Sequence, residues 1–273
     1  MTVNKIEVRN VYKVFGNREK AVLAMIRAGK SKDQVLAETG CVVGINDISL
    51  SIRAGEVFVI MGLSGSGKST LVRHLNRLID PSSGQILVDG EDILDYDMPA
   101  LRHFRRHKIS MVFQNFGLLP HRNVLDNVAY GLKVRGESVA QCQQRALHWI
   151  CVVGLQGYEQ VFIHQLSGGM RQRVGLARAL ATDTDIILMD EAFSALDPLI
   201  RAEMQDQLLE LQRTLQKTIV FITHDLDEAL RIGNRIAVLK DGQLIQVGSP
   251  QEILQAPADD YVGRFVQRRR TSA

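Results

Sequence analysis

The sequence has few cysteines and no long apolar segment, and both absences limit what the protein can be. Three cysteines occur in 273 residues, Cys41, Cys142 and Cys151, and none belongs to a Cys-x-x-Cys pair. This argues against a disulfide framework or a structural zinc site and is typical of a reducing compartment. The longest apolar run, residues 57–63, is far shorter than the ~20 residues of a membrane-spanning helix. The N-terminal residues also lack the apolar core of a signal peptide, so we expect a chain that does not cross a membrane by itself.

An excess of charge is also missing. Lys and Arg number 33 and Asp and Glu number 30, which gives a formal net charge of +3, too small to indicate a nucleic-acid partner. The local exception is the short tail at residues 254–273, which holds four arginines. Such a tail is usually only solvated, and contact with a membrane surface is the alternative. The hydrophobic fraction of 45% is ordinary, and the length suffices for one large domain with an inserted subdomain.

Strand-like and helix-like patterns alternate along the chain. Continuous apolar runs at 57–61, 186–189 and 218–222 are typical of strands buried on both faces. Asp-Gly pairs at 89–90 and 241–242 indicate hairpins. From about 115 to 183 the pattern is nearly all helical. We therefore expect an α/β fold with a mostly parallel sheet, antiparallel edge strands and an inserted helical subdomain.

Residues 17–44 separate two predicted strands that a few residues could join. The pattern predicts a helix over residues 19–27. Ser31 and Gln34 then fit a capping box, and Gly40 fits a helix end. We expect this insertion to form a helical hairpin on the surface.

The segment Gly62-Leu-Ser-Gly-Ser-Gly-Lys-Ser69 matches the pattern G-x-x-x-x-G-K-[ST]. Glycines let backbone N–H groups approach phosphate oxygens, and the following helix directs its positive end at the same anion. Lys68 would bring a positive charge to the terminal phosphates, and Ser69 an oxygen to Mg²⁺. Such a match arises by chance in only about 1% of chains of this size. The predicted nucleotide-phosphate site comprises Gly62, Ser64, Gly65, Ser66, Gly67, Lys68, Ser69 and Thr70.

Two carboxylates follow the apolar run at 186–189. Asp190 is placed to hold Mg²⁺ through its water shell, and Glu191 to act as the general base that polarises an attacking water. Strands often end in acidic residues at a surface, so the pair alone would be weak. Together with the phosphate-binding loop it predicts hydrolysis of a nucleoside triphosphate.

A second anion-binding pattern precedes another predicted helix. Ser167, Gly168 and Gly169 would present a hydroxyl group, free N–H groups and the positive end of a helix. One chain would then hold two phosphate sites and one set of catalytic acids. A head-to-tail homodimer accounts for this, with the Ser-Gly-Gly segment of one subunit covering the nucleotide in the loop of the other.

These motifs and their order resemble the ATP-binding cassette (ABC) family over residues 1 to about 267. The resemblance implies a P-loop NTPase core in a single cassette domain over residues 1–273, with ATP and Mg²⁺ as cofactors. It implies that Gln114 senses Mg²⁺ and the attacking water, that His224 contacts the γ-phosphate, and that Asp197 lies in an inter-subunit loop. It places Phe15 against the adenine ring, with Tyr12 as the competing candidate.

Residues 11–50 and 189–205 are similar to the quaternary-amine importers, which carry glycine betaine, proline betaine or choline. Many betaine cassettes continue into regulatory cystathionine-β-synthase modules after the equivalent of residues 260–262. This chain stops at 273, so we expect no dedicated osmotic sensing by this subunit. Shorter cassettes of the branch resemble histidine-uptake ATPases, which makes histidine the alternative cargo.

The branch also implies partners and a location. We expect a homodimer at the cytoplasmic face of the inner (cell) membrane, bound to integral-membrane permease subunits. A periplasmic or extracellular solute-binding protein would act through the permease. An exporter cassette would often be fused to membrane helices, and a soluble ABC factor would carry two cassettes or a long coiled coil. Neither feature is present in the sequence.

Overall fold

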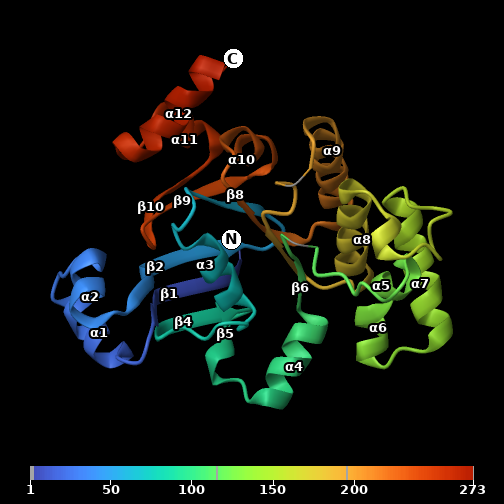
Figure 1. Ribbon diagram of the computed structural model, residues 1–273, viewed down its shortest axis with the longest axis horizontal. Helices are drawn as coiled ribbons and strands as arrows, with labels where there is room; N and C mark the ends of the chain where they lie inside the picture. Colours follow the sequence, from blue (N-terminus) through green and yellow to red (C-terminus); the bar gives the residue numbers. More distant parts are fainter. Residues whose placement is uncertain (1–2, 115, 195, 273) are drawn as a thin grey trace. The chain divides into compact units, whose positions relative to one another are not determined.

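The computed structural model describes residues 3–272 except 115 and 195, with side chains up to residue 267. The expected domain limits at 1 and 273, and the expected start of the helical insertion at 115, lie outside these residues. The chain forms two compact units: unit 1 comprises Met1–Asp97 and Ile222–Ala273, and unit 2 comprises Met98–Phe221. Figure 1 labels most of the helices and strands of both.

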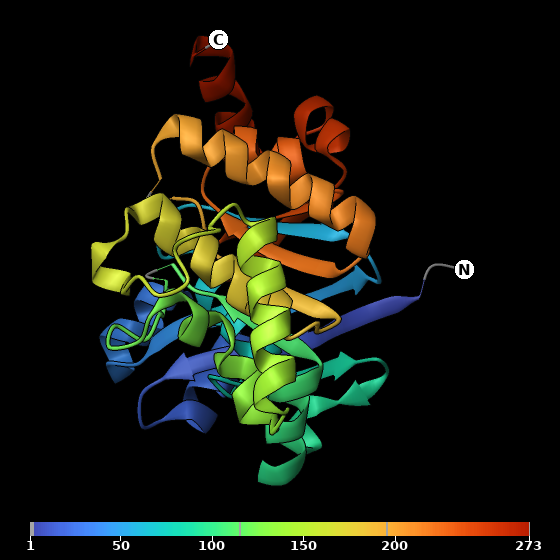
Figure 2. The same cartoon turned by 90° about the vertical axis from the view of Figure 1, so that its right-hand side faces the viewer.

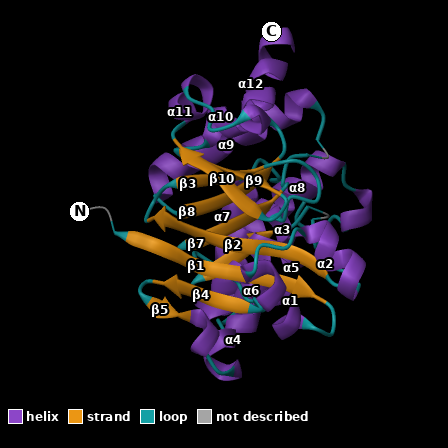
Figure 3. Cartoon of the chain, turned by 90° about the vertical axis from the view of Figure 1, so that its left-hand side faces the viewer, coloured by secondary structure: helices purple, strands orange, loops and turns teal. Residues whose placement is uncertain are grey.

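An antiparallel sheet lies in unit 1. Its strands are β1 (Asn4–Phe15), β2 (Val42–Arg53), β4 (Ser83–Val88) and β5 (Glu91–Asp92). They lie in the order β2-β1-β4-β5, and Figure 3 shows them side by side. Ile6, Val8 and Val11 are buried between more exposed neighbours, as the alternation of a strand with one buried face requires. Both β1 and β2 are longer than the alternating pattern alone predicts.

A second group of strands in unit 1 leads to the phosphate loop. Strand β3 (Val57–Met61) pairs in parallel with β9 (Arg235–Lys240), which pairs antiparallel with β10 (Gln243–Gly248). Every residue of β3 is buried, as its continuous apolar run predicts. The helices of this part are α3 (Lys68–Leu75), α10 (Leu226–Ile232), α11 (Pro250–Gln255) and α12 (Asp260–Ser272), with a 3₁₀ turn at Ile93–Asp95.

The insertion between β1 and β2 contains two helices. Helix α1 (Glu19–Arg27) precedes α2 (Lys32–Thr39), where Ser31 and Gln34 form the capping box and Gly40 takes a left-handed conformation at the end. The apolar side chains of the insertion pack with those of the adjoining strands in a small core: Val14, Val22, Leu23, Val35, Cys41 and Val43. The three cysteines of the chain are free.

Unit 2 combines parallel strands with the helices from α4 to α9. Strand β6 (Ile109–Val112) pairs in parallel with β7 (Ile186–Asp190), and β8 (Thr218–Thr223), which ends in unit 1, lies beside β7. The helices are α4 (Met98–His107), α5 (Val124–Val128), α6 (Tyr130–Arg135), α7 (Val139–Val152), α8 (Gly168–Ala181) and α9 (Pro198–Leu215), with a 3₁₀ turn at Ile163–Gln165.

Helices α5 to α8 enclose an apolar core of their own. Figure 2 shows α7 in yellow-green next to α8 in darker yellow. Ile150 of α7 and Val174 of α8 are among the fully buried side chains there. Parallel strands, an antiparallel edge strand and these helices confirm the predicted α/β fold. No helix within the described residues is both long enough and apolar enough to cross a membrane.

Candidate functional site

The phosphate-binding loop joins β3 to α3 and depends on glycine at both ends. Gly62, at φ 153°, approaches β9 so closely that a Cβ would lie 2.3 Å from the carbonyl oxygen of Leu239. Gly67, at φ 98°, would place a Cβ 2.8 Å from the carbonyl oxygen of Gly44. A Cβ at Gly65 would meet no atom within 4 Å. The loop therefore packs against the fold at its ends and is open at Gly65, where a ligand can approach the backbone.

The side chains of this loop suit a phosphate group. The Lys68 ammonium is buried and donates to the carbonyl oxygens of Gly62, at 2.9 Å, and Leu63, at 3.0 Å. The hydroxyl of Ser66 is buried and has no hydrogen-bond partner in the described part of the chain. Ser69 and Thr70 lie in the first turn of α3, and Ser64 is exposed. A cation, hydroxyl groups and the start of a helix are groups that suit an anion.

The turn between β9 and β10 supports the loop from behind. The Gly242 N–H donates to the Ser66 carbonyl at 3.0 Å, and the Gly242 carbonyl accepts from the Asn46 N–H at 2.8 Å. The sequence marked residues 241–242 only as a hairpin and gave no sign of this contact. Gly242 and Asn46 are therefore structural residues of the site that sequence reasoning missed.

Phe15 and Tyr12 occupy different environments. Phe15 ends β1 with 39% of its surface exposed, and the Lys13 ammonium lies 5.4 Å from its ring centroid. Tyr12 packs against the small core of the insertion, and the Arg27 guanidinium lies 5.6 Å from its ring centroid. The more exposed ring of Phe15 is therefore the better candidate for stacking on a base.

Gln114 and Glu191, far apart in the sequence, meet in unit 2. The Gln114 Nε2 donates to the Glu191 Oε2 at 3.0 Å. Glu191 follows β7 with φ 46°, an unusual value for a residue with a side chain. Asp190 before it is almost fully buried, with 1% of its surface exposed. The structure thus brings together the predicted base and the predicted sensing glutamine.

Helix α8 also holds the segment that follows Gln114. The Arg178 guanidinium donates to the carbonyl oxygens of Gly117, at 2.7 Å, and Phe116, at 3.1 Å. Both of those residues have positive φ, 55° and 60°, which turns their carbonyls toward the same donor. Burial lowers the pKa of the Arg178 guanidinium. Sequence reasoning missed this arginine because nothing in its surroundings marks a partner 61 residues earlier.

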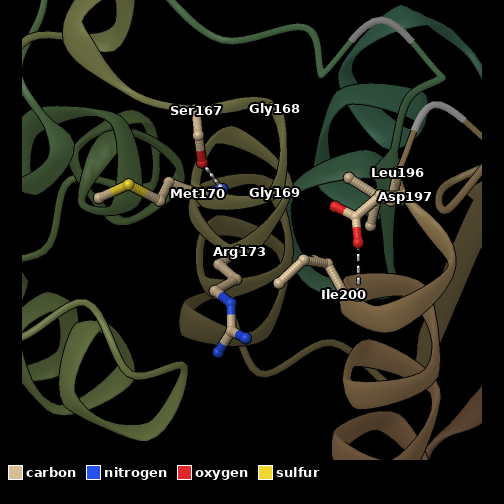
Figure 4. Close-up of a pocket in the computed structure, with 8 residues that line it drawn as sticks. All are labelled: Ser167, Gly168, Gly169, Met170, Arg173, Leu196, Asp197 and Ile200. Carbon is tan, nitrogen blue, oxygen red and sulfur yellow. Dashed lines mark hydrogen bonds between the residues drawn. The ribbon is translucent and has the colours of Figure 1, made fainter.

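The predicted second anion site lines a pocket of about 370 Å³ at the starts of α8 and α9. Figure 4 shows its residues: Ser167, Gly168, Gly169, Met170, Arg173, Leu196, Asp197 and Ile200. Ser167 caps α8 by accepting from the Met170 N–H at 3.2 Å, and Asp197 caps α9 by accepting from the Ile200 N–H at 3.1 Å. The pocket therefore unites three predicted residues with Asp197, and adds the guanidinium of Arg173.

Arg173 is the charged residue that sequence reasoning missed in this pocket. Its guanidinium donates to the Val153 carbonyl at 3.0 Å and pairs with Glu203 at 3.1 Å. These bonds fix the side chain beside Gly169, whose missing Cβ leaves room for Ile200. His224 follows β8 and is exposed, in unit 1 with the phosphate-binding loop.

The family model for ABC transporters matches residues 45–194. The chain is 57% identical over 261 residues to the glycine betaine/proline betaine transport system ATP-binding protein ProV of Salmonella typhimurium, covering 96% of this chain and 65% of that protein. It is 56% identical over 263 residues to the glycine betaine transport ATP-binding protein OpuAA of Bacillus subtilis, covering 96% and 63%. It therefore spans slightly less than two thirds of the length of these relatives.

In two further comparisons, the aligned residues make up a larger share of the matched protein. The trimethylamine N-oxide transport system ATP-binding protein TmoW of Ruegeria pomeroyi is 52% identical over 262 residues, which cover 96% of this chain and 77% of TmoW. A dimeric bacterial ABC transporter cassette has a TM-score of 0.76 and 33% identity, with 90% of this chain and 98% of that chain covered. With these matches and the P-loop NTPase architecture, the chain belongs to the ABC transporter family.

Proposed function

We propose that this chain binds and hydrolyses ATP with Mg²⁺ and thereby energises an importer of a small quaternary amine. The loop from Gly62 to Ser69 supports the nucleotide part, because its open backbone and buried lysine suit phosphate. The role in transport is supported by one observation: nearly the whole chain is similar to ATP-binding proteins of betaine transport systems.

Five of the predicted residues have these roles in the proposal. Lys68 contacts the terminal phosphates, Phe15 stacks on adenine, and His224 contacts the γ-phosphate. Glu191 accepts a proton from the attacking water. The hydrogen bond from Gln114 supports that role, because it orients the Glu191 carboxylate.

The donor set also fits Mg²⁺, which prefers hard oxygen ligands. We assign to it the hydroxyl of Ser69, the side-chain oxygen of Gln114 and, through water, the carboxylate of Asp190. When bound, the ion would offset the negative charge of the phosphates. The deep burial of Asp190 supports the assignment, since a buried carboxylate is poorly screened by solvent.

Two subunits are proposed to share each nucleotide. The pocket at the start of α8 offers the Ser167 hydroxyl, the N–H groups of Gly168 and Gly169, and the Arg173 guanidinium, which suit an anion. The acids and the phosphate-binding loop supply one site per chain. In a head-to-tail homodimer this pocket would cover the nucleotide of the partner subunit.

The remaining partners follow from the same proposal. The dimer would bind permease subunits at the cytoplasmic face of the cell membrane and receive cargo from a solute-binding protein through the permease. Glycine betaine, proline betaine and choline are the first cargo candidates. Trimethylamine N-oxide is favoured next by the similarity to TmoW, and histidine remains the alternative that the sequence suggested.

A reconstituted complex of the chain with its permease and binding protein tests this function. ATPase activity should rise several-fold with a quaternary amine outside and should remain basal with histidine or a sugar. Stimulation by histidine alone would replace the cargo assignment. Stimulation by a sugar or a metal ion, with none by the amines, would contradict the importer branch.

A further inference from the structure

The hydroxyl of Tyr261, on helix α12, binds the backbone of the phosphate loop. It accepts a hydrogen bond from the Leu63 N–H at 3.1 Å and donates one to the Leu239 carbonyl at 3.2 Å. Tyr261 is buried, with 9% of its surface exposed. The hydroxyl therefore ties the loop to the end of β9 at a place that little water reaches.

The peptide group between Gly62 and Leu63 is held at both ends. Its N–H donates to Tyr261, and its carbonyl oxygen accepts from the Lys68 ammonium at 2.9 Å. A peptide group is planar and nearly rigid, so a tilt of one end displaces the other. Loss of the Tyr261 hydroxyl would thus shift the oxygen that holds the lysine.

The ring of Tyr261 is fixed by contacts that do not involve its hydroxyl. Phe265 packs edge-on against it, with ring centroids 5.2 Å apart, and the Lys240 ammonium lies 5.2 Å from the ring centroid. Gly62 meanwhile approaches Leu239 too closely to admit a Cβ. The ring packing belongs to α12, whereas the hydroxyl serves the loop.

We infer that Tyr261 is a positioning residue for the nucleotide site, which fixes the Gly62–Leu63 peptide and, through it, the Lys68 ammonium. The Tyr261 hydroxyl thereby joins helix α12 to the phosphate-binding loop. The inference rests on the proposed function, because its effect on activity is measured through ATP with Mg²⁺. Since Lys68 would hold the phosphates in both the ground state and the transition state, the loss should affect binding more than turnover.

The test compares Tyr261→Phe, which removes only the hydroxyl, with Phe265→Leu, which disturbs the packing of α12 and retains the Tyr261 hydroxyl. In the full chain, Tyr261→Phe should weaken binding of MgATP and raise KM by about 3- to 10-fold, as expected when the loop loses the hydrogen bond from the Leu63 N–H. Its kcat should stay within about twofold of the wild type. Phe265→Leu should lower the thermal midpoint without this change in affinity.

Hydrogen exchange at the Leu63 amide gives a readout that does not depend on ATP. In the wild type this amide should exchange at least about tenfold more slowly than an unprotected amide, and Tyr261→Phe should remove that protection. An unprotected Leu63 amide in the wild type would overturn the inference, even if the variant fails to fold. Equal affinity for MgATP in the wild type and Tyr261→Phe would also overturn it. A wild-type chain that does not bind MgATP would instead refute the proposed function.

Discussion

Replacing Arg178 by methionine should loosen the segment that follows Gln114. The guanidinium donates to two carbonyl groups, at 2.7 Å and 3.1 Å, and no carboxylate in the described part of the chain forms an ion pair with it. A hydrogen bond from a charged donor contributes about 1.5–3 kcal/mol. Relief of the buried charge offsets part of the loss of two such bonds, so we expect about 2 kcal/mol of destabilisation.

Thermal unfolding measures the loss of stability, and ATPase assays measure the effect on turnover. For a chain of this size, 2 kcal/mol lowers the thermal midpoint by roughly 4–8 °C. Because Gln114 lies directly before the released segment, kcat should also fall, by about tenfold. The matched control is Arg145→Met on α7, where the arginine forms a partly exposed ion pair with Glu137 at 3.3 Å and should cost less than about 1 kcal/mol. Equal shifts in the two variants would refute the reasoning.

Three further predictions concern single side chains. Glu191→Gln should keep ATP binding and slow phosphate release about 100- to 10,000-fold; near-normal turnover would remove Glu191 from the role of base. Ser167→Asp keeps a good N-cap for α8 but places a negative charge in the pocket, so the thermal midpoint should hold while ATPase activity is lost; retained activity would contradict an anion site there. Burial lowers the pKa of His74, so the unfolded chain binds more protons at low pH and stability should fall as the pH drops below about 6.5. In His74→Gln the difference between thermal midpoints at pH 7.5 and pH 5.5 should shrink, and an unchanged difference would exclude His74 as its source.

The local elements could be predicted where a short pattern determines them. The continuous apolar run of β3 is bounded by glycines, and Ser31 with Gln34 marks the start of α2 as it would in an isolated peptide. The helical pattern after the phosphate-binding loop extends from residue 68 to 78, whereas helix α3 ends at Leu75. Arg77 adopts φ 53° while its guanidinium donates to the Ile93 and Tyr96 carbonyls, and such tertiary contacts override helix propensity.

The alternating patterns at residues 6–11 and 45–52 predict shorter strands than the observed β1 and β2, and an irregular pairing is the reason. The alternation of β1 shifts at residues 8–11, where the pairing with β2 changes register. Asn10 and Asp47 have positive φ there, and the Asn10 Nδ2 donates to the Asp47 carboxylate at 3.0 Å. A bulge of this kind breaks the period-two pattern while the ladder continues. The alternating pattern therefore indicated only part of each strand.

The residues of the candidate site fall into two groups: those that a short sequence motif identifies, and those that only the folded chain brings into place. Residues that offer donors to a phosphate, such as Lys68 and Ser167, belong to short motifs whose spacing reflects one turn and one helix start. Residues that hold those motifs in place do not: Tyr261 meets Leu63 across 198 positions, and Arg178 meets Gly117 across 61. Each contact uses a backbone group as its partner, and backbone groups are present in every residue. Sequence patterns can therefore identify the chemistry of such a site, whereas its supporting hydrogen bonds become visible only when the folded chain brings a side chain to a particular peptide group.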